Sequence, residues 1–412
     1  MQALGRPFWN SGSDMNSKFA LQVSRPAHRR PQSRLHLRYL QLHEPREPHE
    51  SPDAESAAAI IDMCRKRATP APPAKYDALE ARLRQFRARE LVGRHTPGRR
   101  AILADLIARM LPMALGYSGS AIVRFPHNIP AVLLFALATV SMLGSWFHDA
   151  VHKSIPAPRT ATRLLARIGS APVGFSPKWW SYKHVRLHHK YVGNPEFDPD
   201  IQFGYLGRVS AAQQWHPLHS TQYIHMWLLL PFATLNMLKP SELWTVRRFR
   251  RYSGIGHPPA GWVFLTDKYL PLALVWLPVL LLQGPRNFLL TFVTFQLAAG
   301  TLTSLVTQVQ HNTILADSST DYSMRWPLCD QLARTTDVGT GRSAWWWVCG
   351  GTNMHIVHHI IPALSFLELP AVTARLRTEL AELGVPYPSH KTLRAALWSH
   401  ALLIRALARR PG

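Results

Sequence analysis

The stretch IPAVLLFALATVSMLGSWFHDAVH, residues 129–152, joins an uncharged apolar run to a pair of histidines. Residues 129–147 carry no charged side chain, and a helix of that length crosses the hydrocarbon core of a bilayer. His148 and His152 follow directly at positions i and i+4, so a continued helix presents both imidazoles on one face, where they can share a metal. The stretch therefore predicts a membrane helix that ends in a metal-binding face.

Three further segments have the apolar composition of membrane helices. They are residues 102–123, 269–283 and 287–307. The last two are separated only by Gly-Pro-Arg, and a link that short predicts an antiparallel pair. Asp105 and Arg109 stand in the first turns of residues 102–123, so the membrane portion of that segment is expected to begin near Met110. The run 225–238 contains Pro231 and is too short to span, which favours an interfacial or re-entrant helix over a buried helix of a soluble core.

Charge predicts the orientation of these four spans. The Arg-rich residues 82–100 precede the first span, whereas the links on the opposite side, residues 124–130 and 284–286, carry almost no positive charge. The positive-inside rule then places both termini in the cytoplasm. Lys and Arg exceed Asp and Glu by 47 − 24 = 23, which implies an anionic partner. The basic residues are scattered and no nucleic-acid-binding motif accompanies them, so membrane lipids and an acidic protein are expected rather than nucleic acid.

Composition divides the chain into three parts. Residues 1–75 are rich in Pro, Arg, His and Ser and are expected to form a disordered tail, residues 76–391 the membrane domain, and residues 392–412 a basic amphipathic helix. That helix suits either an anionic membrane surface or packing on the domain. Residues 1–20 lack the apolar core of a secretory signal, so insertion is expected to depend on internal segments. The three cysteines form no C-x-x-C pair, which excludes a zinc ribbon or a rubredoxin-like site within this chain and predicts reduced thiols.

Two more histidine clusters follow HDAVH. HVRLHH and HIVHH each have a chance expectation of about 0.05 in a chain of this composition. With four spans, all three clusters lie on the cytoplasmic side, and His311 lies where the last span ends. Nine neutral imidazoles are too many for one metal but suit two, and imidazole accepts Fe, Zn, Cu or Ni. The nine candidate ligands are His148, His152, His184, His188, His189, His311, His355, His358 and His359.

Carboxylates beside the clusters are candidates for a supporting role. Asp149, Asp198 and Asp200 can each accept the spare N–H of a ligating imidazole and fix its tautomer, or can be simple solvated carboxylates. The Glu-x-x-His motif of ferritin-like dimetal sites does not occur in the sequence. Trp179, Trp180 and residues 345–347 border the second and third clusters; they favour a position at the lipid headgroups over the lining of an acyl tunnel.

As a set these motifs resemble a known family. HDAVH, then HVRLHH followed by KYVGNPEFDPDI, then NMHIVHHIIPALSFLELP resemble the three histidine boxes of the integral-membrane fatty acid desaturases, over about residues 100–375. The resemblance implies an all-α membrane protein with four transmembrane helices and a cytoplasmic helical cap. It also implies that the boxes bind two irons, with His311 as an additional ligand. The HPGG haem signature of a fused cytochrome b5 is absent, and GHPPAG around His257 lacks its Gly-Gly pair.

The resemblance implies a fatty acyl desaturase that uses O2 and two electrons to form a C=C bond. The electrons are expected from a separate ferredoxin-like or cytochrome b5-like donor with its reductase. An acyl hydroxylase or acetylenase on the same diiron scaffold is the nearest alternative, because the same oxidant serves all three reactions. A non-catalytic membrane metal-binding protein is the alternative of another class. It predicts His, Asp or Glu along the spans as a translocation path, and the last three spans contain none.

Overall fold

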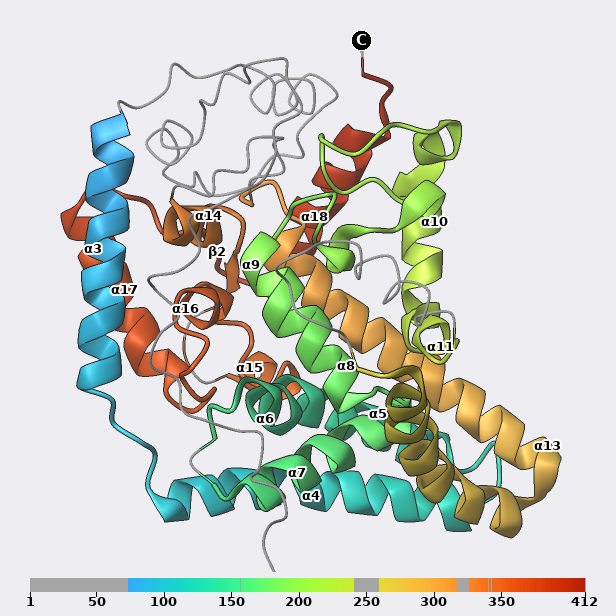
Figure 1. Ribbon diagram of the computed structural model, residues 1–412. Helices are drawn as coiled ribbons and strands as arrows, with labels where there is room; N and C mark the ends of the chain where they lie inside the picture. The colour runs from blue at the N-terminus through green and yellow to red at the C-terminus, as the bar shows by residue number, and fades with distance from the viewer. Residues whose placement is uncertain are drawn as a thin grey trace, which may run out of the picture. The chain divides into compact units, whose positions relative to one another are not determined.

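The computed structural model describes residues 73–411 except 156, 241–258, 317–325, 340 and 342, and this part of the chain is mostly helical (Figure 1). The α-helices are α3 (Pro73–Val92), α4 (Arg99–Ile122), α5 (Ile129–Met142), α6 (His148–His152), α7 (Arg159–Ser170), α8 (Pro177–Ser181), α9 (His189–Tyr191), α10 (Gln222–Leu229), α11 (Ala233–Met237), α13 (Gly261–His311), α14 (Pro327–Ala333), α15 (Ala344–Val348), α16 (His355–Ile360), α17 (Leu369–Glu382) and α18 (Leu393–Ala408). Two π-helices, η1 (Leu143–Phe147) and η3 (Tyr182–His188), directly precede α6 and α9. Five short 3-10 turns are η2 (Ala171–Val173), η4 (Pro199–Ile201), η5 (Gly204–Leu206), η6 (Pro217–Thr221) and η7 (Leu230–Phe232).

One small element departs from the expected all-α architecture. The strands β1 (Asp337–Val338) and β2 (Ser389–His390) pair in parallel, with Asp337 opposite Ser389. This pair ties the segment before the third histidine box to the segment after α17. Strands of two residues carry no sequence signal of alternating hydrophobicity, so the pairing depends on tertiary contacts.

Three helical runs among the described residues are long and apolar enough to cross a membrane. They are α4, the continuous run Ile129–His152 through α5, η1 and α6, and α13. On α4, Leu103, Ile107, Leu111 and Leu115 recur every fourth residue and are all more than half exposed. Such a stripe of exposed leucine and isoleucine is unfavourable in water and suits contact with lipid. The chain therefore has the helices of an integral membrane protein.

Helix α13 is two helices joined at Gly284. The backbone there has φ 75° and ψ 166°, a conformation that glycine adopts without steric cost. The ring of Trp276 lies 5.1 Å from that of Phe295, although 19 residues of straight helix would separate them by about 28 Å. The chain therefore doubles back at Gly284, and Figure 1 shows the two limbs of α13 meeting at a sharp bend. The predicted antiparallel pair is present.

Helices α4 and α5 pack closely against each other. A Cβ on Gly116 would lie 2.5 Å from the backbone nitrogen of Phe135, so only glycine permits this approach. Small residues allow membrane helices to come together in this way. The contact places the end of the second run, and hence His148, at a fixed position relative to α4.

An ion pair lies in the first half of α4. Arg109 is fully buried, its guanidinium Nε lies 2.9 Å from Asp105 Oδ2, and it also donates to Ser141 and to the Trp347 carbonyl. Trp146 Nε1 donates to the same Asp105 oxygen, over 3.0 Å. The two charges thus compensate each other within α4. Their contacts connect this helix to the segments that precede the first and third histidine boxes.

The remaining predicted segments include the short apolar run, the C-terminal helix and the N-terminal tail. The run 225–238 is broken at Pro231 into α10, the 3-10 turn η7 and α11. In α18, Leu403 and Leu407 are buried, so this side of the C-terminal helix packs on the domain. The predicted tail, residues 1–75, lies outside the described residues except for its last three, which begin α3. Cys329 and Cys349 are buried free thiols, and Cys64 lies outside the described part.

Candidate metal centre

The first two histidine clusters are shaped by π-helical turns, η1 directly before His148 and η3, which contains His184 and His188. Hydrogen bonds in a π-helix run from i to i+5, which brings residues five apart onto one face. In η3 and the start of α9 this places His184 and His189 with their Nε2 atoms 3.1 Å apart. An ordinary α-helix would turn these two imidazoles in different directions. The sequence contained no signal for either π-helix.

The nine candidate histidines form two groups, within each of which the ligand atoms lie no more than 4.8 Å apart. The first group contains His148, His152, His184, His189 and His358. Its Nε2–Nε2 separations include 2.9 Å from His148 to His184 and 3.0 Å from His358 to His189. Every cluster contributes to this group, and the predicted convergence of the three clusters is therefore present in the structure.

The second group contains His188, His311, His355 and His359. The Nε2 of His311 lies 2.9 Å from that of His355 and 3.2 Å from that of His188. The two groups are adjacent, since the rings of His189 and His359 stack with centroids 4.3 Å apart. His311, at the end of α13, thus joins the boxes.

The Nδ1 contacts show which ring nitrogens face inward as acceptors. His188 Nδ1 lies 3.1 Å from both carboxylate oxygens of Asp198, His311 Nδ1 lies 3.1 Å from the Arg334 carbonyl, and His359 Nδ1 lies 2.6 Å from Gln331 Oε1. Each neutral imidazole has one N–H, and these acceptors take it on Nδ1. The Nε2 atoms then point lone pairs at one another at about 3 Å, which is unfavourable unless a cation lies between them.

The donor set fits transition metals. Ligands at about 2.1 Å from a metal and at right angles to each other lie about 3.0 Å apart, as these Nε2 atoms do. Metal binding requires neutral imidazoles. Burial holds the pKa of His184, His189, His355, His358 and His359 well below the ordinary value. Their buried and uncharged state suits two metal ions held by four or five nitrogens each.

The carboxylates behave differently from one another. Burial alone would lower the pKa of His188, but the Asp198 carboxylate outweighs it and the pKa is raised. Asp200 lies 3.5 Å from the same Nδ1 and 2.5 Å from Lys183 Nζ. Asp149 was predicted to accept the N–H of an imidazole, but its carboxylate instead accepts the backbone N–H of Phe366 over 2.9 Å. It thereby joins the first box to the segment after the third.

Two hydrogen-bond partners of the histidines were not predicted from the sequence. Gln331 and the carbonyl of Arg334 belong to α14 and its C-cap, a segment without any motif. Gln331 also donates from Nε2 to the backbone carbonyl of His189, over 2.6 Å. Their only sequence signal is a glutamine in a short polar stretch, and this does not distinguish them from surface residues.

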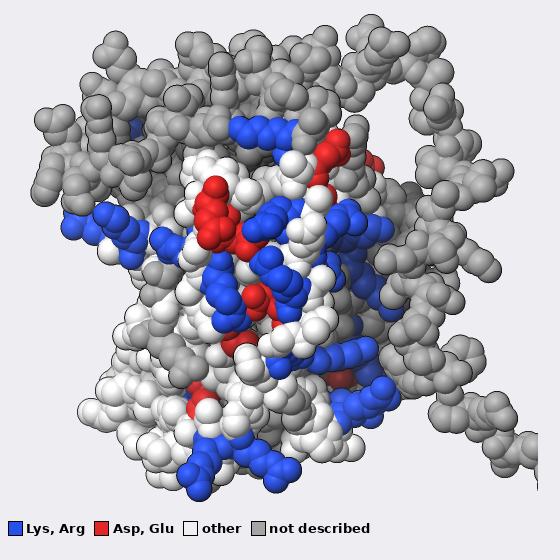
Figure 2. All heavy atoms as spheres, turned by 90° about the vertical axis from the view of Figure 1, so that its left-hand side faces the viewer, with Lys and Arg blue, Asp and Glu red and all other residues white. Residues whose placement is uncertain are grey.

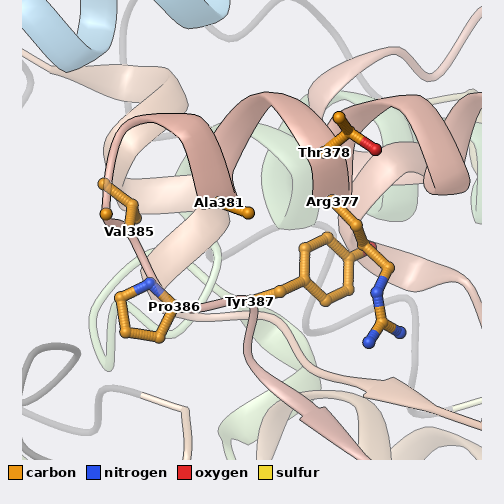
Figure 3. Close-up of a pocket in the computed structure, with 7 residues that line it drawn as sticks. Arg377, Thr378, Ala381, Val385, Pro386 and Tyr387 are labelled. Carbon is orange, nitrogen blue, oxygen red and sulfur yellow. The ribbon is translucent and has the colours of Figure 1, made fainter.

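Asp337 holds the start of the third box. This buried residue of β1 accepts the Ile356 N–H over 2.9 Å, at the first turn of α16, and the Tyr387 hydroxyl over 2.5 Å. Tyr387 lines a surface pocket at the end of α17, where the guanidinium carbon of Arg377 lies 5.1 Å from the centre of its ring (Figure 3). Asp337 therefore fixes α16, and with it His355, to β1.

Replacing Asp337 by alanine is expected to destabilise the protein by about 1–3 kcal/mol, because it leaves the buried Ile356 N–H without an acceptor. Asp337→Asn keeps an acceptor oxygen and is expected to cost less. Thermal unfolding of the detergent-solubilised variants, with bound metal measured in parallel, checks this. Equal melting temperatures for the wild type and Asp337→Ala would contradict the assigned role.

A cavity of about 860 Å³ leads to the histidines. Its lining includes His148, His184, His188, His311 and His355 together with apolar side chains of α10, η7 and α11. Trp179 and Trp180 also line it, and the Trp180 ring stacks on His184 with centroids 4.1 Å apart. These two tryptophans were predicted to lie at the lipid headgroups, and that prediction is wrong, because Trp179 is 3% exposed and both face the cavity. The cavity has the size and apolar lining of a site for a long hydrocarbon chain.

Comparison with known proteins agrees with this arrangement. Residues 125–391 match the family described as fatty acid desaturase. The chain is 24% identical to the sn-1 linoleoyl-lipid 6-desaturase of Synechocystis sp. over 302 residues, 70% of this chain and 82% of that protein. It is 22% identical to the enzyme of the same name from Arthrospira platensis over 251 residues (58% and 67%), and 24% identical to the acyl-lipid (8-3)-desaturase of Mortierella alpina over 307 residues (68% and 64%).

The fold and the site define a class: a helical membrane protein whose histidines converge in two adjacent groups. The match over most of the chain shows that it belongs to the fatty acid desaturase family. It is a fatty acyl desaturase, an oxidoreductase, as predicted from the boxes.

Proposed function

We propose that this protein is an acyl-lipid desaturase whose nine histidines hold two iron ions at the end of an acyl-chain cavity. The observation that carries the proposal is the convergence of the Nε2 atoms of two groups beside a cavity of about 860 Å³. The relatives from Synechocystis and Arthrospira are named for action on linoleoyl-lipid, which supports a lipid as the acyl carrier here. The metal's identity as iron follows from the family resemblance.

The reaction removes two hydrogens from adjacent methylenes. The acyl –CH2–CH2– unit, O2, two electrons and two protons give –CH=CH– and two waters. Iron, when bound by these imidazoles, supplies the oxidising power toward an unactivated C–H bond that side chains lack. Histidine nitrogens resist oxidation where thiolates would not. The apolar walls position the chain and exclude water, and Asp198 and Gln331 keep the protons of His188 and His359 on Nδ1.

Four membrane crossings with both termini in the cytoplasm are part of the proposal. The bend at Gly284 divides α13 into two limbs, which together with α4 and the second run would give the four spans. The Arg-rich residues 82–100 and the nearly uncharged links support the orientation. This orientation would put the histidines on the cytoplasmic face.

A separate, acidic electron donor fits the charge around the first two boxes. Between Asp149 and Glu196 the sequence contains eight Lys or Arg and no Asp or Glu. Complementary charge steers the encounter of two proteins. A ferredoxin-like or cytochrome b5-like protein with an acidic face would meet this condition. The GHPPAG segment, whose His257 lies outside the described residues, lacks the Gly-Gly pair of a fused haem domain.

The test is mass-spectrometric analysis of the total fatty acids, with double-bond positions, of a host that expresses the chain together with a ferredoxin and its reductase. A new unsaturated acid on glycerolipids, absent from the host without the chain, is the expected result. An oxygenated product would contradict desaturation, and a product found on acyl-coenzyme A before lipids would contradict the acyl carrier.

A further inference from the structure

Gln331 touches both histidine groups with a single amide. Its Oε1 accepts the Nδ1–H of His359 over 2.6 Å, and its Nε2 donates to the carbonyl of His189 over 2.6 Å. His189 belongs to the first group and His359 to the second. The side chain is 5% exposed, so neither bond is replaced by bulk water. A change in its position would therefore move a donor of each group.

Helix α14, which carries Gln331, is held at its N-terminus by a glutamate from α3. Glu80 Oε2 accepts the N–H groups of Leu328 and Cys329, over 2.9 and 3.1 Å. N–H groups in the first turn of a helix have no partner within the helix, and a carboxylate there is favourable. Glu80 is 5% exposed, which strengthens these bonds relative to a surface cap. Asp77, also on α3, accepts Trp326 Nε1 over 2.8 Å.

Helix α3 is in turn fastened to α17. Arg82 and Arg89 pair with Glu379, and Arg375 pairs with Glu90 over 2.5 Å. Figure 1 shows α3 beside α17, and Figure 2, which looks onto this side, shows acidic and basic side chains interleaved. Helix α3 precedes residues 125–391, the part that matches the desaturase family. It thus lies outside the matched residues and contacts α14, the helix that carries Gln331.

We propose that Gln331 is a positioning residue of the metal centre and that α3 keeps it in place through Glu80. The proposal rests on the proposed function, because it needs the histidines to hold metal. Glu80 of α3 binds the first turn of α14, and α14 carries Gln331. The amide of Gln331 then orients the His359 ring and binds the backbone carbonyl of His189. The role is positional, since Gln331 acts on the metal only through these two residues.

The first arm of the test measures the iron affinity of the purified full chain, by competition with a chelator, for the wild type, Gln331→Leu and Gln331→Glu. Loss of a partner behind a ligating histidine typically weakens metal affinity 10- to 100-fold, and this is expected for Gln331→Leu. Gln331→Glu still accepts from His359 and is expected to recover part of the affinity. Wild-type affinity in Gln331→Leu, or equal losses in both variants, would overturn the role.

The second arm tests α3. Glu80→Ala is expected to weaken iron binding, Glu80→Gln to retain it because one oxygen still accepts both N–H groups, and Glu90→Ala, which removes an ion pair from the same helix, to leave it unchanged. If Glu80 acts through Gln331, then Glu80→Ala adds little to Gln331→Leu in the double variant. Additive losses, or an equal loss in Glu90→Ala, would overturn the link.

Iron binding by the wild-type chain distinguishes a failure of the proposed function from a failure of the positioning role. A wild-type chain that binds no iron would refute the proposed function itself. A wild-type chain that binds two irons while the Gln331 and Glu80 variants match it would refute only the positioning role. Thermal unfolding of each variant shows whether a loss of iron follows from general unfolding, in which case Glu80→Ala and Glu90→Ala would lose iron in proportion to their loss of stability.

Discussion

Replacement of His358 by alanine is expected to abolish both iron loading and formation of the unsaturated product. The Nε2 of His358 lies 3.0 Å from that of His189 in the first group, and its ring also lies 4.3 Å from His148. Removing it takes a nitrogen donor from the proposed metal site and leaves a gap among buried imidazoles. The loss of iron affinity is expected to exceed the 10- to 100-fold effect of losing a residue that only hydrogen-bonds to a ligating histidine. Iron content of the purified variant and fatty acid analysis of the expressing cells check this.

His127→Ala is the matched control. His127 is exposed, lies in the link between α4 and α5, and belongs to neither histidine group. It is expected to keep iron and product at the wild-type level. A His358→Ala variant that is fully loaded with iron and active would remove His358 from the proposed ligands.

Replacement of Asp105 by leucine is expected to destabilise the protein by about 3–5 kcal/mol, the cost of leaving one member of a buried ion pair without its partner. Arg109 is fully buried, so its charge cannot reach water unless the surrounding segments move. Trp146 Nε1 loses its acceptor in the same variant. Denaturant titration of the solubilised protein, followed by tryptophan fluorescence, measures the change.

The double variant Asp105→Leu, Arg109→Met provides the control for this prediction. Replacing both members of a buried pair by apolar residues is often neutral or stabilising. The double variant is therefore expected to be more stable than Asp105→Leu alone, although Ser141 and the Trp347 carbonyl each lose the bond from Arg109. A double variant less stable than the single one would show that Arg109 does not act as an uncompensated charge.

The long apolar helices and the histidine clusters were predictable because each depends on local sequence. An uncharged run of membrane length and a repeated His spacing carry their meaning within a few residues. The Gly-Pro-Arg link predicted the bend of α13 for the same reason, since only a glycine fits the backbone at position 284 without strain. Pro231, likewise, predicted the break between α10 and α11.

The partners of the histidines were predictable only where they lie close in sequence. Asp198 follows His188 by ten residues and contacts it, whereas Gln331 reaches His359 from another helix. Asp149 stands beside His148 in sequence, but its carboxylate points to Phe366. The two π-helical turns and the placement of Trp179 in the cavity wall depend on packing between distant segments. No single-sequence pattern encodes such contacts.

X-ray absorption spectroscopy at the iron edge of the purified, iron-loaded protein tests the central claim most directly, because it reports the atoms bound to the metal. The proposed site predicts two irons per chain whose first shell is nitrogen and oxygen, with the multiple-scattering pattern of several imidazoles. This pattern is expected to weaken in His358→Ala. Sulfur in the first shell, or iron without imidazole scattering, would contradict the claim that the two histidine groups form the metal centre.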